Sequence, residues 1–367
     1  MVNGLSIGAI YALIAVGYTM VYGVLRLINF AHGDVYMVGA MVGLYVATGR
    51  MDFLAAPILV HPLLWGAAAL VVMVGAMLGK LPKLARGSRV VLVVCIGMVL
   101  VSLASRAVTK VGLPSWTGFA LVLTSAMVAC GLIGMLIEML AYRPLRGRPR
   151  LDSLITAIGI SLFLMAGGQA VFGATPQAFP QVIPGVEQNP NLFSISFGTN
   201  SNGVPSTVTI SKINALILGV TLALMLVLRH IVLHTKAGLA LRAVSFRFDT
   251  SSLMGIDVNK TVSFTFILGS VLAASGGVLV ALYSPKVEPL MGLMVGLKAF
   301  VAAVLGGIGS IPGAVAGALL LGVIETLVTG YVDGGSQYRD GVAFVILIAV
   351  LLLRPSGLFG ERAIEKV

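Results

Sequence analysis

Eleven apolar runs, most of them about 20 residues long, constrain the fold of this chain more than any other feature. A helix needs about 20 apolar residues to cross a hydrocarbon core of about 30 Å. We place spans near residues 3–25, 31–48, 54–78, 90–108, 119–141, 153–173, 209–233, 261–283, 291–305, 312–330 and 341–353. The short runs 31–48, 291–305 and 341–353 are typical of tilted, broken or re-entrant helices. The sequence therefore predicts an all-α, polytopic membrane bundle of about 11 spans, forming one domain over residues 1–367.

Composition supports this class. Of the 367 residues, 58% are hydrophobic and only 10% are charged, whereas soluble domains average about 25% charged residues. The start, Met1 to Gly4, has no basic n-region and is predicted to be a retained first span. Cys95 and Cys130 lie in apolar runs without metal-binding spacing, so we predict two small buried residues.

Lysines and arginines gather in alternate loops, which predicts the orientation. One set of loops holds 17 of the 24 basic residues, the other set holds 6, and Lys298 lies within a span. The richer side is expected to be cytoplasmic, so the N-terminus is outside and the C-terminus inside. This segregation explains the net charge of +11 better than nucleic-acid binding does.

Two loops are long enough to do more than connect spans. In the outer loop, 173–208, the segments 192–197 and 204–210 predict a small hairpin. In the inner loop, 234–260, apolar and basic residues alternate at helical spacing and predict two short amphipathic helices. Asp249 is expected to N-cap the second of these, and Gly255 is expected to end it at C′.

Lys298 is the most informative single residue, because a charge within a span needs a partner or a water-filled path. Two hypotheses have equal weight. In one, Lys298 faces the path and orients a substrate carboxylate or holds a gate. In the other, it forms a structural ion pair, with Glu325 as first choice and Glu138 as second.

The glycine-rich break at 306–313 follows Lys298. We favour a tight inner turn between two spans, with Pro312 at the first helical position, over backbone groups presented to a cavity. The GxxxG pairs Gly4/Gly8 and Gly292/Gly296 further predict close helix packing.

Three polar residues join the first two spans. Asn29 is expected to N-cap the second helix, with Asp34 facing the helix dipole in its first turns. A substrate or gating role for His32 or Asp34 is the less favoured hypothesis, and a lone histidine makes no metal site.

Catalytic patterns are missing from the sequence. It contains no GxxxxGK[ST] or HExxH motif, and its four histidines are too far apart to propose a site. We therefore expect a protein that is not an enzyme and holds no cofactor or metal. If transport needs ATP, another chain must supply it.

Several segments together resemble LivH-type permeases, the membrane subunits of bacterial ABC importers for branched-chain amino acids. They are residues 3–23 with 27–34 (Leu-Ile-Asn-Phe-Ala-His-Gly-Asp), 141–146, 253–257, 296–300 with 305–313, and 338–340 (Tyr-Arg-Asp). The resemblance implies two cytoplasmic ATPase subunits, a second permease (LivM-type or a second copy) and a periplasmic binding protein, in the bacterial inner membrane. The loop 234–260 would then dock on the ATPase through Arg242, Ala243, Asp249, Gly255 and Ile256.

The sequence departs from the family pattern at two places. Residues 245–252 replace the family's acidic, alanine-rich stretch, and 50–118 is predicted to be an insertion of two extra spans. The expected function is import of branched-chain amino acids, with Lys298, Glu325, His32, Asp34 and Asn29 as path or gate candidates. Alternatives are import of urea or short amides by the same architecture, and an ion-driven secondary transporter. An intramembrane enzyme is disfavoured because no acid/base or metal cluster lies within the spans.

Overall fold

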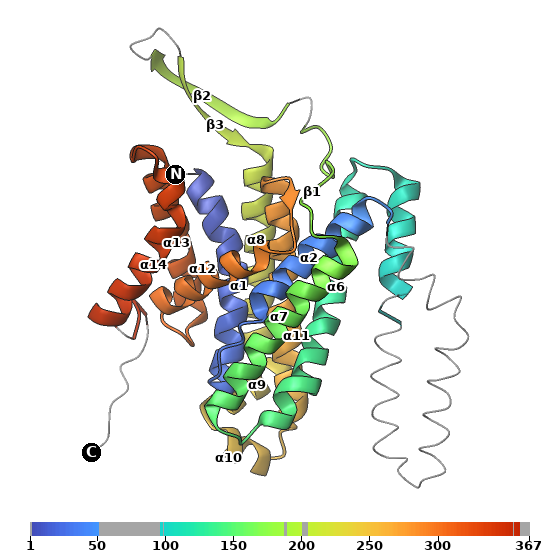
Figure 1. The fold of residues 1–367 in the computed structure, drawn as a ribbon, viewed down its shortest axis with the longest axis vertical. Helices are drawn as coiled ribbons and strands as arrows, with labels where there is room; N and C mark the ends of the chain where they lie inside the picture. The colour runs from blue at the N-terminus through green and yellow to red at the C-terminus, as the bar shows by residue number, and fades with distance from the viewer. Residues whose placement is uncertain are drawn as a thin grey trace.

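The computed structural model describes residues 2–50, 96–97, 99–186, 189–199, 205–354 and 356–359. These residues form a helical bundle with two small two-stranded sheets (Figure 1). The long elements are α1 (Val2–Leu25), α2 (His32–Ala47), α6 (Trp116–Ile137), α7 (Arg150–Phe172), α8 (Lys212–His234), α11 (Val258–Tyr283), α12 (Met291–Gly306), α13 (Ile311–Tyr331) and α14 (Gly335–Leu353). The shorter ones are the π-helix η1 (Glu138–Tyr142), the 3-10 helix η2 (Arg143–Leu145), α9 (Lys236–Phe246), α10 (Phe248–Leu253), β1 (Gln177–Ala178), β2 (Asn191–Thr199), β3 (Pro205–Ser211) and β4 (Lys286–Val287).

Each long helix coincides with a span predicted from the sequence. Seven of the helices in the described residues are long and apolar enough to cross a membrane, which confirms a helical membrane protein. Helices α2 and α12 have 16 residues each, as two of the short apolar runs predicted, and at 1.5 Å per residue they fall short of a full crossing. The third short run, 341–353, is part of α14, which has 19 residues and is long enough to cross. The span 54–78 and Cys95 lie outside the described residues, and of 90–108 only 96–97 and 99–108 are described, all helical.

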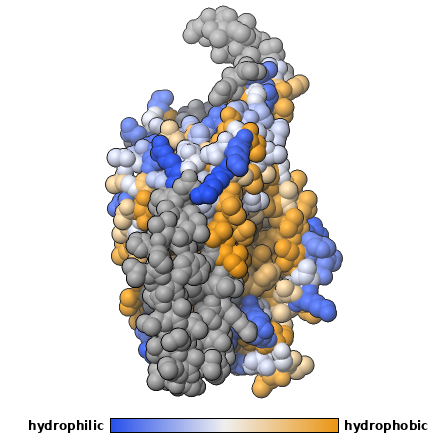
Figure 2. All heavy atoms as spheres, turned by 90° about the vertical axis from the view of Figure 1, so that its right-hand side faces the viewer, coloured by the Kyte–Doolittle hydropathy of each residue, from blue (hydrophilic) through white to orange (hydrophobic). Residues whose placement is uncertain are grey.

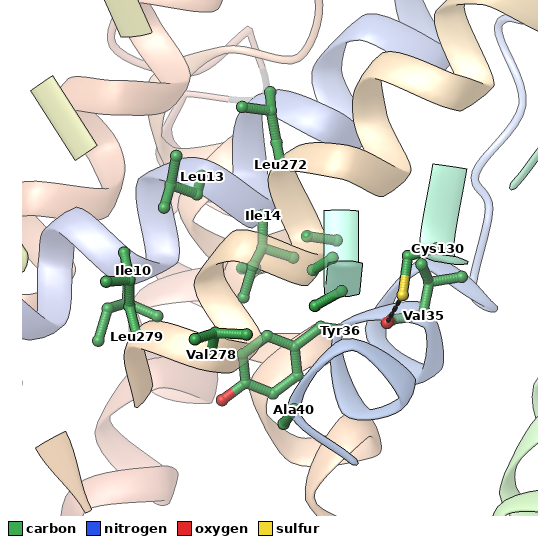
Figure 3. Close-up of a cluster of buried hydrophobic side chains, with 14 of the residues drawn as sticks. Ile10, Leu13, Ile14, Val35, Tyr36, Ala40, Cys130, Leu272, Val278 and Leu279 are labelled. Atoms are coloured by element: carbon green, nitrogen blue, oxygen red, sulfur yellow. Dashed lines mark hydrogen bonds between the residues drawn. The ribbon is translucent and has the colours of Figure 1, made fainter. Parts of the chain in front are cut away.

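Helix α1 is the centre of the bundle, and nearly all of its length is buried. It packs on α11 and α13, while α11 also packs on α2 and α6. In Figure 3 Ile10 and Ile14 of α1 meet Val278 and Leu279 of α11, next to the ring of Tyr36 on α2. The buried thiol of Cys130 donates to the Val35 carbonyl oxygen at 3.4 Å (Figure 3), in agreement with its predicted burial.

Glycines let the central helices touch backbone to backbone. A Cβ added at Gly322 of α13 would overlap the backbone of Gly4 and Gly8 on α1. A Cβ at Gly296 of α12 would likewise press on the backbone of Gly33 on α2. These contacts confirm the close packing predicted from the two GxxxG pairs, and they make van der Waals contact a main source of cohesion in the bundle.

Helices α7, α8 and α14 lie at the periphery and expose long apolar faces. Figure 2 shows hydrophobic residues across the middle of one face, with hydrophilic residues gathered above and below them. Such a band matches the hydrocarbon layer of a bilayer.

Both predicted loop structures are present. Strands β2 and β3 pair antiparallel, with Ile195 opposite Val208, and form the predicted hairpin at the end of the molecule opposite α10 (Figure 1). Helices α9 and α10 confirm the two short helices predicted within residues 234–260. Asp249 is not the N-cap of α10, because Arg247 already has the extended backbone of that position and Asp249 lies in the first turn. Gly255, at φ +81°, ends α10 as predicted, since the N–H groups of Gly255 and Ile256 bond back to Ser252 and Ser251.

Candidate functional site

Lys298 of α12 forms an ion pair with Glu325 of α13. The distance from Lys298 Nζ to Glu325 Oε1 is 3.1 Å, and the two residues are 5% and 0% exposed. The first-choice partner predicted from the sequence is therefore correct, and Glu138 belongs to a different cluster. The turn at 306–313 that joins the two helices is also confirmed, with Gly307 and Gly309 at positive φ and Pro312 in the first turn of α13.

Three further groups join the pair of Lys298 and Glu325, and we call these five residues the central cluster. Arg339 Nε of α14 lies 2.8 Å from Glu325 Oε2, and Asp340 Oδ1 lies 2.5 Å from Lys298 Nζ. The Tyr11 hydroxyl of α1 donates to Glu325 Oε2 at 3.0 Å. Two acids thus balance two bases, and four helices meet at one network. Sequence reasoning missed Tyr11, Arg339 and Asp340 as partners, although Arg339 and Asp340 were visible as adjacent charges at the start of an apolar run.

Because most of this network is buried, each charged member depends on its partners. Removing one partner of a buried ion pair leaves an uncompensated charge, which costs about 3–5 kcal/mol. Among the described residues, the network reaches the surface on the α14 side, where the Asp340 side chain is 54% exposed. It therefore fastens α12, α13 and α14 to α1 and presents one carboxylate on the outside of the chain.

Asn29 does not cap α2. Ala31 occupies the N-cap position in a helical conformation, without a side-chain cap, because the chain already turns there through a bond from the His32 N–H to the Asn29 carbonyl. The Asn29 side-chain oxygen instead accepts a hydrogen bond from the Tyr142 hydroxyl at 3.0 Å. Asn29 thus ties the loop before α2 to η1.

The first turn of α2 brings His32 and Asp34 beside α12. Asp34 lies in the first turn as predicted and accepts a hydrogen bond from Ser161 of α7. The buried His32 ring packs edge-on against Tyr18 at 4.7 Å between centroids, and its Nε2 has no hydrogen-bond partner among the described residues. Gly33 touches Gly292 and Gly296. The starts of two short helices, α2 and α12, therefore meet at this point.

Glu138, which is fully buried, is the hub of a second cluster. We call this cluster the inner clamp: Glu138, Arg143, Arg146, Asn259 and Ser263. Glu138 Oε2 lies 2.7 Å from Arg143 Nη2, and Glu138 also pairs with Arg146 and accepts from Ser263. Arg146 Nη1 donates to Asn259 Oδ1 at 2.6 Å. The inner clamp joins the end of α6 to the first turns of α11, directly after α10. A π-helix at Glu138 is a further sign of a functional position.

Helices α9 and α10 form an exposed surface at the end of the bundle. Leu241 and Val244 of α9 are buried, whereas Phe246, Leu253 and Met254 are 79%, 86% and 78% exposed. Arg242 is exposed and donates to the Leu233 carbonyl, and Ala243 is half-buried. Behind α10, Asp257 caps α11 by accepting from the Lys260 N–H, and this bond lowers the pKa of Asp257.

Comparison with known proteins points to one family. A family model described as "Branched-chain amino acid transport system / permease component" matches residues 1–114 and 84–351. The chain is 38% identical to the high-affinity branched-chain amino acid transport system permease protein BraD of Pseudomonas aeruginosa, across 100% of this chain and 97% of BraD. It is 35% identical to the corresponding protein LivH of Escherichia coli, across 100% of this chain and 96% of LivH. No solved structure matches.

Proposed function

The chain belongs to the family of branched-chain amino acid transport system permease components, and from this premise we propose that it carries branched-chain amino acids across the bacterial inner membrane. The observation that carries the proposal is the 38% identity to BraD along the whole chain. The helical bundle and its exposed inner helices support it. Proteins of this kind are transport components and not enzymes.

The N-terminus lies outside, the C-terminus lies inside and about 11 spans connect them. The distribution of basic residues supports this orientation, with 17 of 24 in one set of loops. The hairpin β2–β3 and the pair α9–α10 lie at opposite ends of the bundle (Figure 1), as outer and inner structures must.

The chain works with two ATPase subunits that bind ATP, a second permease of LivM type or a second copy, and a periplasmic binding protein. The exposed side chains of Phe246, Leu253 and Met254 support an ATPase contact, because large apolar groups outside the membrane layer favour a protein partner. Arg242, Ala243, Asp249, Gly255 and Ile256 complete this coupling surface. The outer loop 173–208, with its hairpin, is where the binding protein docks.

Motion at the coupling surface passes directly into α11, because only four residues separate the end of α10 from the start of α11. Helix α11 packs on α1, α2 and α6, so its displacement moves the central helices together. The inner clamp carries the same displacement to α6 through Ser263 and Asn259.

The central cluster is a clamp between helices and not a substrate-binding charge. Lys298 is matched by Glu325 and Asp340, which leaves it no free charge for a substrate carboxylate. Gate residues are better sought at the meeting point of α2 and α12. There Asn29 anchors the loop, Asp34 is held by Ser161, and His32 has a ring nitrogen with no partner in the part of the chain that the structure describes.

Reconstitution tests the proposal. The chain is co-purified with its ATPase and permease partners and placed in liposomes with the binding protein and internal ATP. We expect ATP-dependent uptake of leucine, isoleucine and valine. Uptake of urea without these amino acids overturns the substrate assignment. Uptake by the lone chain under an ion gradient overturns the assignment as an ATP-driven importer.

A further inference from the structure

A second kind of ligand site lies at the inner end of the bundle. A cavity of about 600 Å³ is bounded by the end of α1, the loop between η2 and α7, and the junction of α9 and α10. Four arginines from these three segments line it: Arg26, Arg146, Arg148 and Arg247. We infer that this cavity binds the phosphate of an anionic phospholipid.

The charges in the cavity favour an anion. Arg146 pairs with Glu138, but in the described part of the chain no carboxylate pairs with Arg26, Arg148 or Arg247. Asp249 is the one acidic residue in the lining. Three unpaired guanidinium groups against one carboxylate leave an excess of positive charge, and guanidinium is the side chain best suited to bidentate contact with phosphate.

One of these arginines, Arg26, has a strained backbone conformation. Arg26 follows the last residue of α1 with φ of 54°, a left-handed conformation that non-glycine residues rarely adopt. The turn ends α1 and leaves Arg26 in the cavity wall beside Leu25 and Leu27.

The surroundings favour a lipid over a soluble anion. Beside the arginines and Asp249, the lining combines the apolar residues Val24, Leu145 and Phe248 with the hydroxyl residues Ser245 and Thr250. Ser153 in the first turn of α7 also lines the cavity, and the exposed residues Leu151, Ile155, Ile158 and Leu162 continue along that helix. A phosphate held by the arginines can therefore extend its acyl chains along the exposed face of α7. The positive excess selects an anionic headgroup over zwitterionic phosphatidylethanolamine.

The test compares lipid binding by two double variants of the full-length chain, purified in neutral detergent. Arg148→Gln with Arg247→Gln removes two charges from the cavity. Arg229→Gln with Arg354→Gln removes two exposed charges elsewhere and is the control. Native mass spectrometry measures binding of dioleoyl phosphatidylglycerol, dioleoyl phosphatidylethanolamine and inorganic phosphate, and size-exclusion profiles confirm that each variant is folded.

We expect saturable binding of phosphatidylglycerol that weakens about 20- to 30-fold in the cavity variant and less than 2-fold in the control. Equal losses in both variants overturn the site, because the effect is then one of overall charge. If inorganic phosphate binds as tightly as the lipid, the cavity is a site for a free anion and the lipid assignment is wrong. Unchanged lipid binding together with loss of the co-purified ATPase in the cavity variant shows a protein contact instead. The inference needs only a membrane-spanning chain, so failure of amino acid uptake does not affect it.

Discussion

Two glutamates, Glu325 and Glu138, are both completely buried, yet their surroundings differ. Glu325 belongs to a balanced network of two acids and two bases that joins four helices within the bundle. Glu138 faces two arginines alone, at the end of α6, and their side chains are 31% and 16% exposed. The comparison teaches that a buried carboxylate can fasten a bundle where acids and bases are equal in number. At the bundle's end, one carboxylate faces two guanidinium groups, and this surplus of positive charge makes the contact easier to loosen.

Breaking the central cluster has the largest expected effect. Lys298→Met leaves Glu325 with too few cations and is expected to cost about 3–5 kcal/mol of stability, with loss of transport. Thermal unfolding in detergent and ATP-dependent uptake measure the two effects.

The double variant Lys298→Met with Glu325→Leu removes one acid and one base together and leaves one of each, Asp340 and Arg339, so the charges stay balanced. It is expected to recover most of the lost stability. A double variant no more stable than either single one would exclude Glu325 as the partner of Lys298. Glu288→Gln, at an exposed pair with Lys286, is the matched control and is expected to change stability by less than about 0.5 kcal/mol.

The same change at Glu138 sharpens the comparison. Glu138→Gln is expected to cost about 1–3 kcal/mol, less than the change at Lys298, because water can solvate the two arginines that lose their partner. Since the inner clamp joins α6 to α11, we also expect fewer amino acids imported per ATP hydrolysed. A variant with lower stability but an unchanged ratio of uptake to ATP hydrolysis would show that Glu138 stabilises the fold and has no role in coupling.

At the coupling surface, we expect an effect on transport without an effect on stability. Arg242→Glu reverses an exposed charge and is expected to reduce ATP-dependent uptake at least about tenfold while unfolding stays within about 0.5 kcal/mol of the unsubstituted chain. Arg354→Glu, also exposed, is the control. Normal uptake by the Arg242 variant would argue against its assignment to the ATPase contact.

The cap of α11 has the smallest expected effect. Asp257→Ala removes the acceptor for the Lys260 N–H and is expected to cost about 0.5–1 kcal/mol. Because this bond lowers the pKa of Asp257, its stabilising effect is present above the ordinary pKa of an aspartate and is lost as the pH falls through the lowered pKa. Unfolding measured at pH 7 and near pH 3 should therefore differ less in the variant than in the unsubstituted chain.

Residue spacing predicted much of the fold, because long apolar runs, a glycine turn and alternating strands are local signals. It also predicted the pair Lys298–Glu325, since one buried cation and one buried anion in successive helices have few other choices. Arg339 and Asp340 were not predicted as partners, because their distance to Glu325 and Lys298 depends on how α14 packs against α12 and α13. Asn29 and Asp249 failed as caps for a different reason. The backbone had already begun to turn at neighbouring residues, and cap identity depends on that geometry.

Close contact between α1 and α13 has a consequence for how the protein is made. The hydrogen bond between Tyr11 and Glu325 joins residues 314 positions apart, so α1 is synthesised long before its partner α13. Until then the glycine face of α1 and the Tyr11 hydroxyl have no native neighbour in the membrane. Biogenesis of this permease therefore includes a late docking step, and a chain cut short before α13 should insert into the membrane but remain open to quality-control proteases.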